Sequence, residues 1–353
     1  MISVDNYIIG LLCCIYCCVC WGSWSNTQKK AVNVKSQIMP GGGRQARCEW
    51  TAELFYWDFS IGHFLTGVLG TLTLGSLGSD GQTFMENLSM VDTSSVLFAM
   101  FGGVIWNMAN VFLSSAISVA GMSVAFPIGG GLGWIGGIVF NFVLIIISGQ
   151  QYSGNLLLLW GGVAIIVIAM YINAKAYGMR TEESRGRSLK GILLSLASGI
   201  GFMFFYGFVV RAISPEYISG GMGVMTPYTA VFFFGLGAFV STPLFNGFAM
   251  RYPSLGGEPK TMRDYLSGDM KTHFVGILGG VIWMSGMVIS FMGSGAANPA
   301  ISYALSNASP VVAILWGLFV WKEFNKSPRL AVIYIKTSFI LFIIGLICIS
   351  LSH

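Results

Sequence analysis

Apolar runs of about 20 residues recur along the whole chain, and they constrain its fold more than any other feature. As an α-helix, a run of this length crosses the roughly 30 Å of hydrocarbon in a bilayer. Because backbone groups in lipid must be hydrogen-bonded within the protein, such runs form helices rather than open strands. We expect ten spans, at residues 6–25, 53–77, 95–119, 122–147, 154–173, 189–212, 226–248, 273–293, 297–321 and 330–351.

The composition also predicts an all-α polytopic membrane protein. Hydrophobic residues make up 54% of the chain and charged residues only 9%, whereas ordinary soluble domains carry about 25% charge. No segment alternates over about ten residues as the strand of an outer-membrane barrel does. The formal net charge of +5 comes from loops, so it concerns orientation in the membrane rather than binding of nucleic acid.

Five of the seven cysteines lie in the first apolar run, namely Cys13, Cys14, Cys17, Cys18 and Cys20. Their CCxxCC pattern is compatible with a zinc or redox site, but the run lacks a second pair of ligands. We therefore expect these thiols to act as small apolar side chains, and we expect no metal. The run also lacks a basic n-region and an A-x-A cleavage site, which indicates a retained span rather than a signal peptide.

Basic residues gather in alternate loops, and this pattern predicts the orientation of the chain. Seventeen of the 19 Lys and Arg residues follow the first, fifth, seventh and ninth predicted spans. The opposite loops carry acidic residues instead, which are Asp80, Glu86, Asp92 and Glu216. By the positive-inside rule the basic loops are cytoplasmic, so both termini are expected on the extracytoplasmic side of a plasma (inner) membrane.

The pentapeptide GGVIW occurs twice, at Gly102–Trp106 and at Gly279–Trp283, a shift of 177 residues. A repeat at half the chain length is typical of secondary transporters, although chance identity between Gly- and Ile-rich segments is the alternative. With five spans in each half, the halves enter the bilayer from opposite sides and the repeat is inverted. The predicted organisation is a first five-helix repeat at 1–173, a cytoplasmic linker at 174–190 and a second repeat at 191–353.

Small residues and prolines mark the fourth and ninth predicted spans. Gly129, Gly133 and Gly137 are four residues apart, a spacing that lets helices pack closely and that could also let the halves slide. Pro127 and Pro310 each free a backbone group that neighbours must satisfy or that lines a cavity. No GxxxxGK[ST] loop occurs, so we expect no cofactor and do not expect ATP to drive this protein.

Six motifs spread over most of the chain carry a family resemblance. They are WGSW at Trp21–Trp24, LFYWDFSIG at Leu54–Gly62, LTLGSLG at Leu72–Gly78, LFAMFGGVIWNMAN at Leu97–Asn110, SYALSNASP at Ser302–Pro310 and ILWGLFVWKEF at Ile314–Phe324. These segments resemble the ureide permeases, a family of ten-helix carriers in the drug/metabolite transporter superfamily. The longer central loop of plant members, with its nucleotide-binding-like motif, is missing here.

The resemblance implies a carrier that imports allantoin, other oxo-purines or pyrimidine bases together with protons. Bacterial relatives grade into glucose and rhamnose uptake carriers, so proton-coupled sugar uptake is the alternative, and an efflux carrier is a further one. The expected partners are a small-molecule substrate and the lipid bilayer but no nucleic acid, and the carrier is a monomer or homodimer. No HExxH, no GxSxG and no paired membrane aspartates occur, so we expect no enzyme.

Three ionisable residues inside predicted spans are candidates for proton coupling, because charges are costly in lipid. Asp58 lies among four aromatic residues, where a carboxyl could bind and release a proton or could serve as a structural carboxylate paired with a cation or helix-end amides. His63 could relay a proton or be a hydrogen-bonded core residue. Lys336 could be the counter-ion of Asp58 or could extend to the cytoplasmic interface.

A polar stripe runs along the third predicted span, with Asn107, Asn110, Ser114 and Ser118 at three- and four-residue spacing. Amide side chains offer both donors and acceptors, which suits the alternating N–H and C=O groups of a ureide or nucleobase. Hydrogen bonding between helices is an equally compatible role. Asn307 is the counterpart of this stripe in the ninth predicted span.

Aromatic residues complete the predicted binding site, with Trp21, Trp24, Tyr206, Trp283 and Tyr303 as the candidates. A flat heterocycle would stack on their faces, and a sugar would use the same faces for C–H contacts. Interfacial belts also account for many membrane Trp and Tyr residues. The tryptophan of each GGVIW motif could simply fill an equivalent packing position in the two halves.

Overall fold

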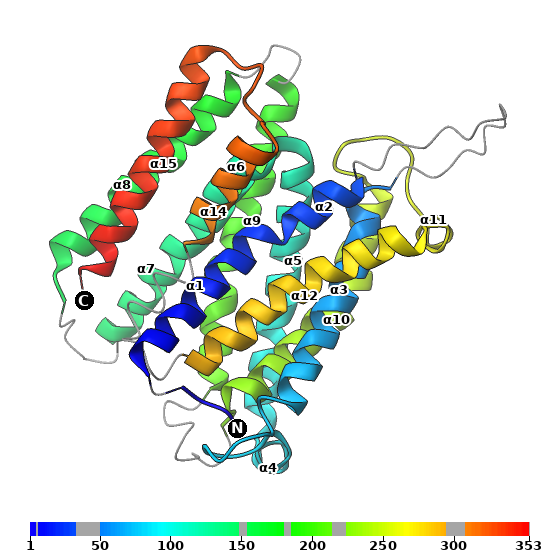
Figure 1. The fold of residues 1–353 in the computed structure, drawn as a ribbon, viewed down its shortest axis with the longest axis vertical. Coiled ribbons are helices and arrows are strands. Elements are labelled where there is room, and N and C mark those ends of the chain that lie inside the picture. Colours follow the sequence, from blue (N-terminus) through cyan, green and yellow to red (C-terminus); the bar gives the residue numbers. More distant parts are fainter. Residues whose placement is uncertain are drawn as a thin grey trace.

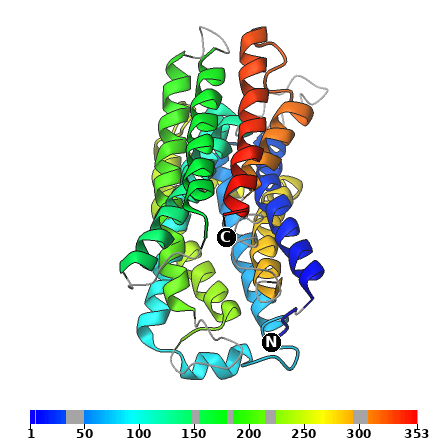
Figure 2. The same cartoon turned by 90° about the vertical axis from the view of Figure 1, so that its left-hand side faces the viewer.

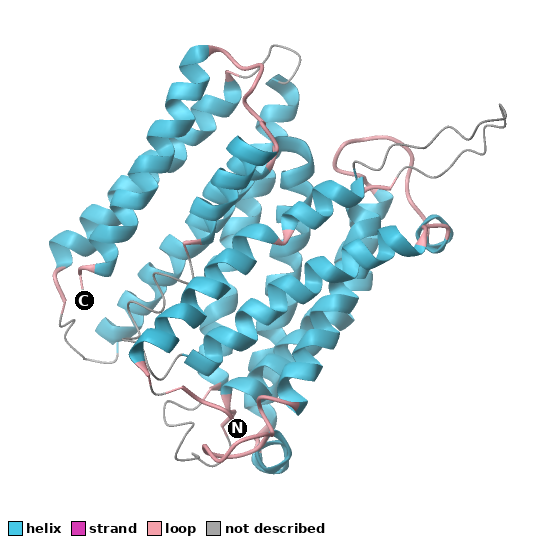
Figure 3. Cartoon of the chain, in the orientation of Figure 1, coloured by secondary structure: helices cyan, strands magenta, loops and turns pink. Residues whose placement is uncertain are grey.

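The computed structural model describes residues 1–4, 6–32, 50–147, 154–179, 185–213, 224–293 and 308–352, apart from the side chains of a few helical residues. Within these ranges the chain is helical and contains no β-sheet (Figure 3). The elements are α1 (Tyr7–Ser23), α2 (Ser25–Val32), α3 (Ala52–Leu72), α4 (Phe84–Met90), α5 (Thr93–Ala120), α6 (Met122–Ala125), the π-helical η1 (Phe126–Gly130), α7 (Gly131–Ile147), α8 (Leu156–Gly178), α9 (Arg185–Ala212), α10 (Pro227–Arg251), α11 (Met262–Leu266), α12 (Met270–Gly293), α14 (Ser309–Leu315), the π-helical η3 (Trp316–Val320) and α15 (Arg329–Ser350).

Eight helical segments of the described chain are long and apolar enough to cross a bilayer. They are Tyr7–Val32, Thr93–Ala120, Met122–Val139, Leu156–Gly178, Leu189–Val209, Pro227–Arg251, Met270–Ser290 and Arg329–Ile349. Large apolar side chains also point outward, among them Leu157 at 82% exposure and Leu244 at 69%, which is costly in water but not in lipid. The prediction of an all-α, multi-pass membrane protein is therefore confirmed.

The count of ten spans does not emerge from these criteria. The second predicted span is α3, a helix of 21 residues that lies in the bundle but is too polar to count among the eight, because it buries Glu53, Asp58 and His63. In the ninth predicted span, residues 297–307 lie outside the described residues, and Ser309–Val320 forms a shorter apolar helix.

Helix extends into both ends of the segment 174–190, which we predicted to be a cytoplasmic linker. α8 continues to Gly178 and α9 begins at Arg185. The end of α8 stays helical because polar side chains tie it to the neighbouring turn. Asn173 donates to the Ser123 carbonyl at 2.9 Å, and the Tyr177 hydroxyl donates to the Val119 carbonyl at 3.0 Å.

Glycine contacts set the closest approach between α3 and α12. A Cβ added at Gly62 would lie 2.0 Å from the Ile277 carbonyl oxygen, and one at Gly280 would lie 2.0 Å from the Phe59 carbonyl oxygen. No side chain fits at either position, so the two backbones touch directly. Along the length of the two helices, Asp58 faces Gly276, Gly67 faces Met284 and Gly70 faces Val288. The facing positions rise together, so α3 and α12 run parallel.

The same contact recurs between α5 and α10. A Cβ at Gly103 would lie 2.0 Å from the Phe234 carbonyl oxygen, and one at Gly237 would lie 2.1 Å from the Met100 carbonyl oxygen. Gly103 and Gly280 are the second glycines of the two GGVIW motifs. Each copy of the motif therefore holds its helix against a helix from the other half of the sequence.

The remaining helices pack around these two crossings. α1 lies against α12, α9 lies against α5, and α8 and α15 form a neighbouring pair along one side of the bundle (Figures 1 and 2). Figure 1 shows α4 and the marked N-terminus at one end of α3 and α10, and α11 at their other end. The packing therefore brings α1, α5, α9 and α12 together at the centre.

The glycine crossings give a stability prediction on a single helix. Gly237→Ala should destabilise the protein by about 1–3 kcal/mol or more, because the new methyl group overlaps the α5 backbone. Gly247→Ala is the matched control, since a Cβ at this position of α10 meets no atom within 4 Å; it should be neutral or stabilising by up to about 1 kcal/mol. Thermal unfolding of the purified proteins in detergent measures both, and equal melting temperatures would contradict the crossing geometry.

Candidate functional site

A cavity of about 100 Å³ lies where α1, α5, η1, α7, α9, α12 and α14 converge. A single water needs only about 10–15 Å³ measured in this way, so the space admits a small organic molecule. Five tryptophans line it, which are Trp21, Trp24, Trp106, Trp134 and Trp283. Such a cavity, mostly aromatic and with few polar groups, is the usual form of a small-molecule site.

The two tryptophans of the GGVIW motifs meet at this cavity. The ring centroids of Trp106 and Trp283 are 4.3 Å apart. Trp21 stacks on Trp283 at 5.3 Å with an interplanar angle of 15°, and its indole N–H donates to the Trp283 carbonyl at 3.2 Å. Trp24 is fully buried and packs on Phe59. Trp21, Trp24 and Trp283, all predicted from the sequence, therefore line one cavity.

His63 belongs to the aromatic wall behind the cavity. Its ring stacks on Trp106 at 4.6 Å and 16°, and it faces Trp283 at 5.0 Å. Its Nε2 has no hydrogen-bond partner among the described residues. The hydrogen bonds of Asp58 run to other residues, so the structure does not join His63 and Asp58 into a relay.

The two asparagines of the polar stripe differ in their hydrogen bonding. Asn107 is fully hydrogen-bonded, since its Nδ2 donates to Ser241 Oγ at 2.9 Å and its Oδ1 accepts from the Tyr56 hydroxyl at 2.9 Å. Asn110 lines the cavity and donates through Nδ2 to Tyr56 at 3.2 Å. Its Oδ1 is buried and has no partner within the described part of the chain, which leaves an acceptor for a ligand.

Trp134 on α7 supplies a donor that the sequence analysis missed. It lines the cavity, and its Nε1 is also buried without a partner among the residues described. The sequence signal for Trp134 was its position directly after Gly133, one of the three glycines spaced four residues apart in the fourth predicted span. Glycines that leave room beside a tryptophan favour a ligand contact as well as helix packing.

A second polar cluster surrounds Asp58, away from the cavity. Its carboxylate accepts from the Tyr265 hydroxyl at 2.6 Å, and His273 Nδ1 lies 2.9 Å from Oδ1 and 3.1 Å from Oδ2. Asp58 is buried, whereas the His273 side chain is 17% exposed. Trp50 packs edge-on against the His273 ring at 5.0 Å. The cluster is therefore a buried carboxylate whose hydrogen-bond partners, Tyr265 and His273, are both partly exposed.

Tyr265 and His273 come from segments that flank the start of α12. Burial, and the Asp58 carboxylate to which it donates, raise the pKa of the Tyr265 phenol, so it remains a hydrogen-bond donor. His273 is one of three histidines in the chain, but sequence reasoning did not single it out because it follows a basic loop. Its place in the first turn of α12, the helix parallel to α3, could have drawn attention to it.

The proposed pairing of Asp58 with Lys336 is not what the structure contains. Lys336 is exposed on α15, which packs against α8 rather than α3. Asp58 is paired with His273 instead. Tyr303 and Asn307 lie outside the described residues, as does the side chain of Tyr206.

The short helix α2 begins directly after Trp24, which lines the cavity, and it binds both halves of the sequence. Gln28 Nε2 donates to the Ser114 carbonyl at 2.8 Å and to Ser118 Oγ at 3.0 Å, and Ser114 donates back to Gln28 Oε1. The two serines of the stripe therefore hold α2 against α5. On its other side, Asn26 accepts from the Trp321 indole at 2.6 Å.

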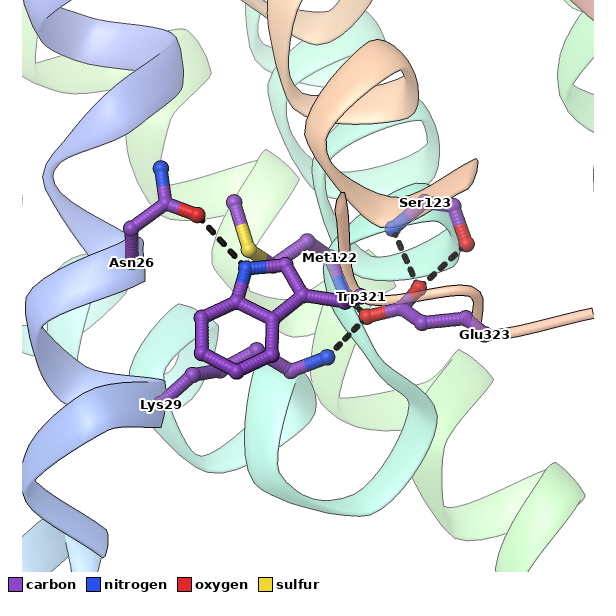
Figure 4. Close-up of polar contacts among 6 residues, drawn as sticks. All are labelled: Asn26, Lys29, Met122, Ser123, Trp321 and Glu323. Carbon is purple, nitrogen blue, oxygen red and sulfur yellow. Dashed lines mark hydrogen bonds and ion pairs between the residues drawn. The ribbon is translucent and has the colours of Figure 1, made fainter. Parts of the chain in front are cut away.

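Glu323 binds α2 to the start of α6 (Figure 4). Its carboxylate pairs with Lys29 of α2, accepts from the Met122 and Ser123 amides at 3.0 Å, and accepts from the Ser123 hydroxyl. The amides belong to the first turn of α6, which follows Gly121 at a φ of +91°. Burial by itself raises the pKa of Glu323, but Lys29 and Ser123 outweigh it and lower that pKa, which keeps the carboxylate charged.

Comparison with known proteins gives a consistent family. The ureide permease family model matches residues 55–190 and 179–352. Ureide permease 1 of Arabidopsis thaliana is 24% identical over 344 residues, covering 82% of this chain and 86% of that protein. The probable glucose uptake protein GlcU of Staphylococcus epidermidis is 24% identical over 283 residues, covering 78% and 84%.

A solved crystal structure shares the fold, with a TM-score of 0.50 over 96% of this chain and 95% of the other at 12% identity. The family match covers well over half of the sequence, including α3, α5 and α12, which carry Asp58 and the two GGVIW motifs. It agrees with a helical membrane protein built around a small aromatic cavity. The chain therefore belongs to the ureide permease family and is a membrane transporter rather than an enzyme.

Proposed function

We propose that this transporter imports a ureide or a nucleobase by proton-coupled alternating access. The observation that carries the proposal is the tryptophan-lined cavity, in which Asn110 presents an unpartnered acceptor and Trp134 an unpartnered donor. Flat heterocycles with N–H and C=O groups stack on indole faces and satisfy both polar atoms. The relatives named as ureide permeases support the same substrate class.

We further propose ten spans in two inverted five-helix repeats, with the basic loops in the cytoplasm and both termini outside a plasma (inner) membrane. The matched glycine crossings support the repeat, since α3 meets α12 as α10 meets α5. In the two crossings, Gly62 of α3 corresponds to Gly237 of α10, and Gly280 of α12 corresponds to Gly103 of α5. An internal two-fold axis would relate the two halves in this way. Alternating access needs such a pair of similar halves around a central site.

The Asp58–His273 pair is our proposal for the proton site. The pair joins α3 to α12, the two helices that carry part of the aromatic wall. A carboxylate buried beside a partly exposed imidazole can exchange a proton with the nearby solution. Protonation removes the charge of the Asp58 carboxylate and changes its hydrogen bonds to Tyr265 and His273, so the proton can alter how α3 and α12 pack.

Competition for uptake tests the substrate class. Cells or proteoliposomes containing the protein are given radiolabelled uracil or allantoin, with unlabelled allantoin, uracil, glucose and rhamnose as competitors. We expect inhibition by the first two and none by the sugars. Inhibition by sugars alone would favour the alternative, proton-coupled sugar uptake, which the relatives named as glucose and ribose uptake proteins support.

Asp58→Asn should abolish proton-driven accumulation while sparing counterflow of labelled substrate. The amide keeps the size of the side chain but cannot exchange a proton at neutral pH. Glu53→Gln is the matched control, because Glu53 is a second buried carboxylate on α3 that is occupied by the Ser254 amide and hydroxyl at 3.0 and 3.1 Å. Uphill uptake that persists in Asp58→Asn would refute the role.

We propose that α2 closes the end of the cavity near Leu113 and Ser114, so Glu323→Gln should open that end. Loss of the charge weakens the bonds to Lys29 and Ser123, so labelling of a buried Ser114→Cys by an impermeant maleimide should rise about fivefold or more. The measurement uses inside-out vesicles and a background in which the seven native cysteines are replaced. Glu258→Gln, at an exposed glutamate, should leave the rate unchanged, and equal rates in both variants would contradict the closure.

A further inference from the structure

We infer that a one-way hydrogen-bond relay from α10 fixes Asn110 as an acceptor, so that a ligand must donate a proton to it. The relay runs through Ser241, Asn107 and Tyr56 to Asn110. This inference rests on the proposed function and deepens it, because it assigns the polarity of the site and names Tyr56 as a positioning residue for substrate selection.

The direction of the relay is set at its α10 end. The Ser241 hydroxyl donates to the Ala238 carbonyl at 3.0 Å, and a carbonyl oxygen can only accept. With its proton used, Ser241 Oγ accepts from Asn107 at 2.9 Å. Thr242 Oγ1 lies 3.0 Å from the same carbonyl, 2.8 Å from Ser60 Oγ and 3.3 Å from the same Asn107 nitrogen. Ser241 as an acceptor requires the NH₂ group of Asn107 on the α10 side.

The orientation of Asn107 then determines the role of Tyr56. Asn107 presents its Oδ1 to the Tyr56 hydroxyl at 2.9 Å, and this oxygen can only accept. Tyr56 must therefore donate to Asn107, which leaves the phenol oxygen as an acceptor toward Asn110. Tyr56 is 1% exposed, so water does not offer its proton another partner.

Asn110 is the last member of the relay and the one that faces the cavity. Its Nδ2 donates to the Tyr56 oxygen at 3.2 Å. A flipped amide would place two acceptor oxygens against each other, because the Tyr56 proton already points to Asn107. Oδ1 is therefore the atom left for a ligand. It is buried, and Asn110 as a whole is only 1% exposed.

Trp134 offers the ligand a donor where Asn110 offers an acceptor, because an indole N–H can only donate. A ligand that fills both groups carries at least one N–H or O–H donor and one acceptor, as compounds with –NH–CO– groups do. A ligand that fills the cavity without offering a donor leaves the Asn110 oxygen unpaired and shielded from water. Sites built in this way discriminate by about tenfold or more against such a ligand.

The test compares ligands that differ only in their donors. Binding of uracil and allantoin, each beside its fully N-methylated derivative, is measured calorimetrically on the purified wild-type protein and on Tyr56→Phe. Wild type should prefer the parent compounds by about tenfold or more. Tyr56→Phe frees the Asn110 amide to turn, so the preference should fall toward equal binding. Any steric cost of the methyl groups is common to both proteins and cancels in this comparison.

Two further variants separate positioning from a general structural effect. Tyr177→Phe removes another buried phenol, which donates to the Val119 carbonyl away from the cavity, and should keep the wild-type preference. Asn110→Leu keeps the side-chain size but removes the acceptor, so it should weaken the parent compounds about tenfold and leave the methylated ones unchanged.

The outcomes distinguish the inference from the function on which it rests. Equal binding of parent and methylated compounds by wild type overturns the relay and leaves the proposed function intact. An unchanged preference in Tyr56→Phe, or equal losses for all ligands in Asn110→Leu, also overturns it. Failure of wild type to bind either uracil or allantoin overturns the proposed function itself.

Discussion

Direct contact between backbones at the glycine crossings is the interaction on which the rest of the structure depends. Helices in lipid gain little from burying apolar side chains against each other, so their association relies on close packing. At Gly280 on α12 and Gly103 on α5 the partner carbonyl occupies the space where a side chain would begin. These contacts bring Trp106 and Trp283 to 4.3 Å, and the wall of the cavity follows from that meeting.

Among the described residues, two of the buried polar atoms without a partner, Asn110 Oδ1 and Trp134 Nε1, line the cavity, and others such as Asn173 Oδ1 and Asn246 Oδ1 lie elsewhere. An unpaired polar atom in the interior is costly, and at the cavity a ligand can relieve that cost. Asn107 and Asn110 illustrate the difference one turn apart, since the first is fully bonded and the second is not. The same helix face therefore supplies both the rigid support of the site and its open position.

Sequence reasoning could predict what is local and periodic, and it failed where the answer depends on which helices are neighbours. The apolar runs, the GGVIW pair and the buried Asp58 follow from spacing and polarity within one segment. The partner of Asp58 does not, because His273 is 215 residues away. Lys336 was an equally reasonable counter-ion until the structure placed α15 beside α8. Likewise Glu323 looks like a loop residue, and only its contact with α6 and Lys29 reveals its burial.

The glycine crossings and the contacts of α2 are of different kinds. In a carrier that alternates, the helices of the crossings would stay together and α2 would separate from its neighbours. At the crossings of α3 with α12 and α5 with α10, backbone meets backbone, and parting them would open voids that nothing fills. At α2 the contacts are polar, through Gln28 and Lys29, and water can replace each hydrogen bond at modest cost. Movement is therefore expected at α2 and the segment around Glu323, while the crossings turn as rigid units. If α2 closes the cavity as we propose, its polar contacts can part at that end while the glycine contacts keep the walls in place.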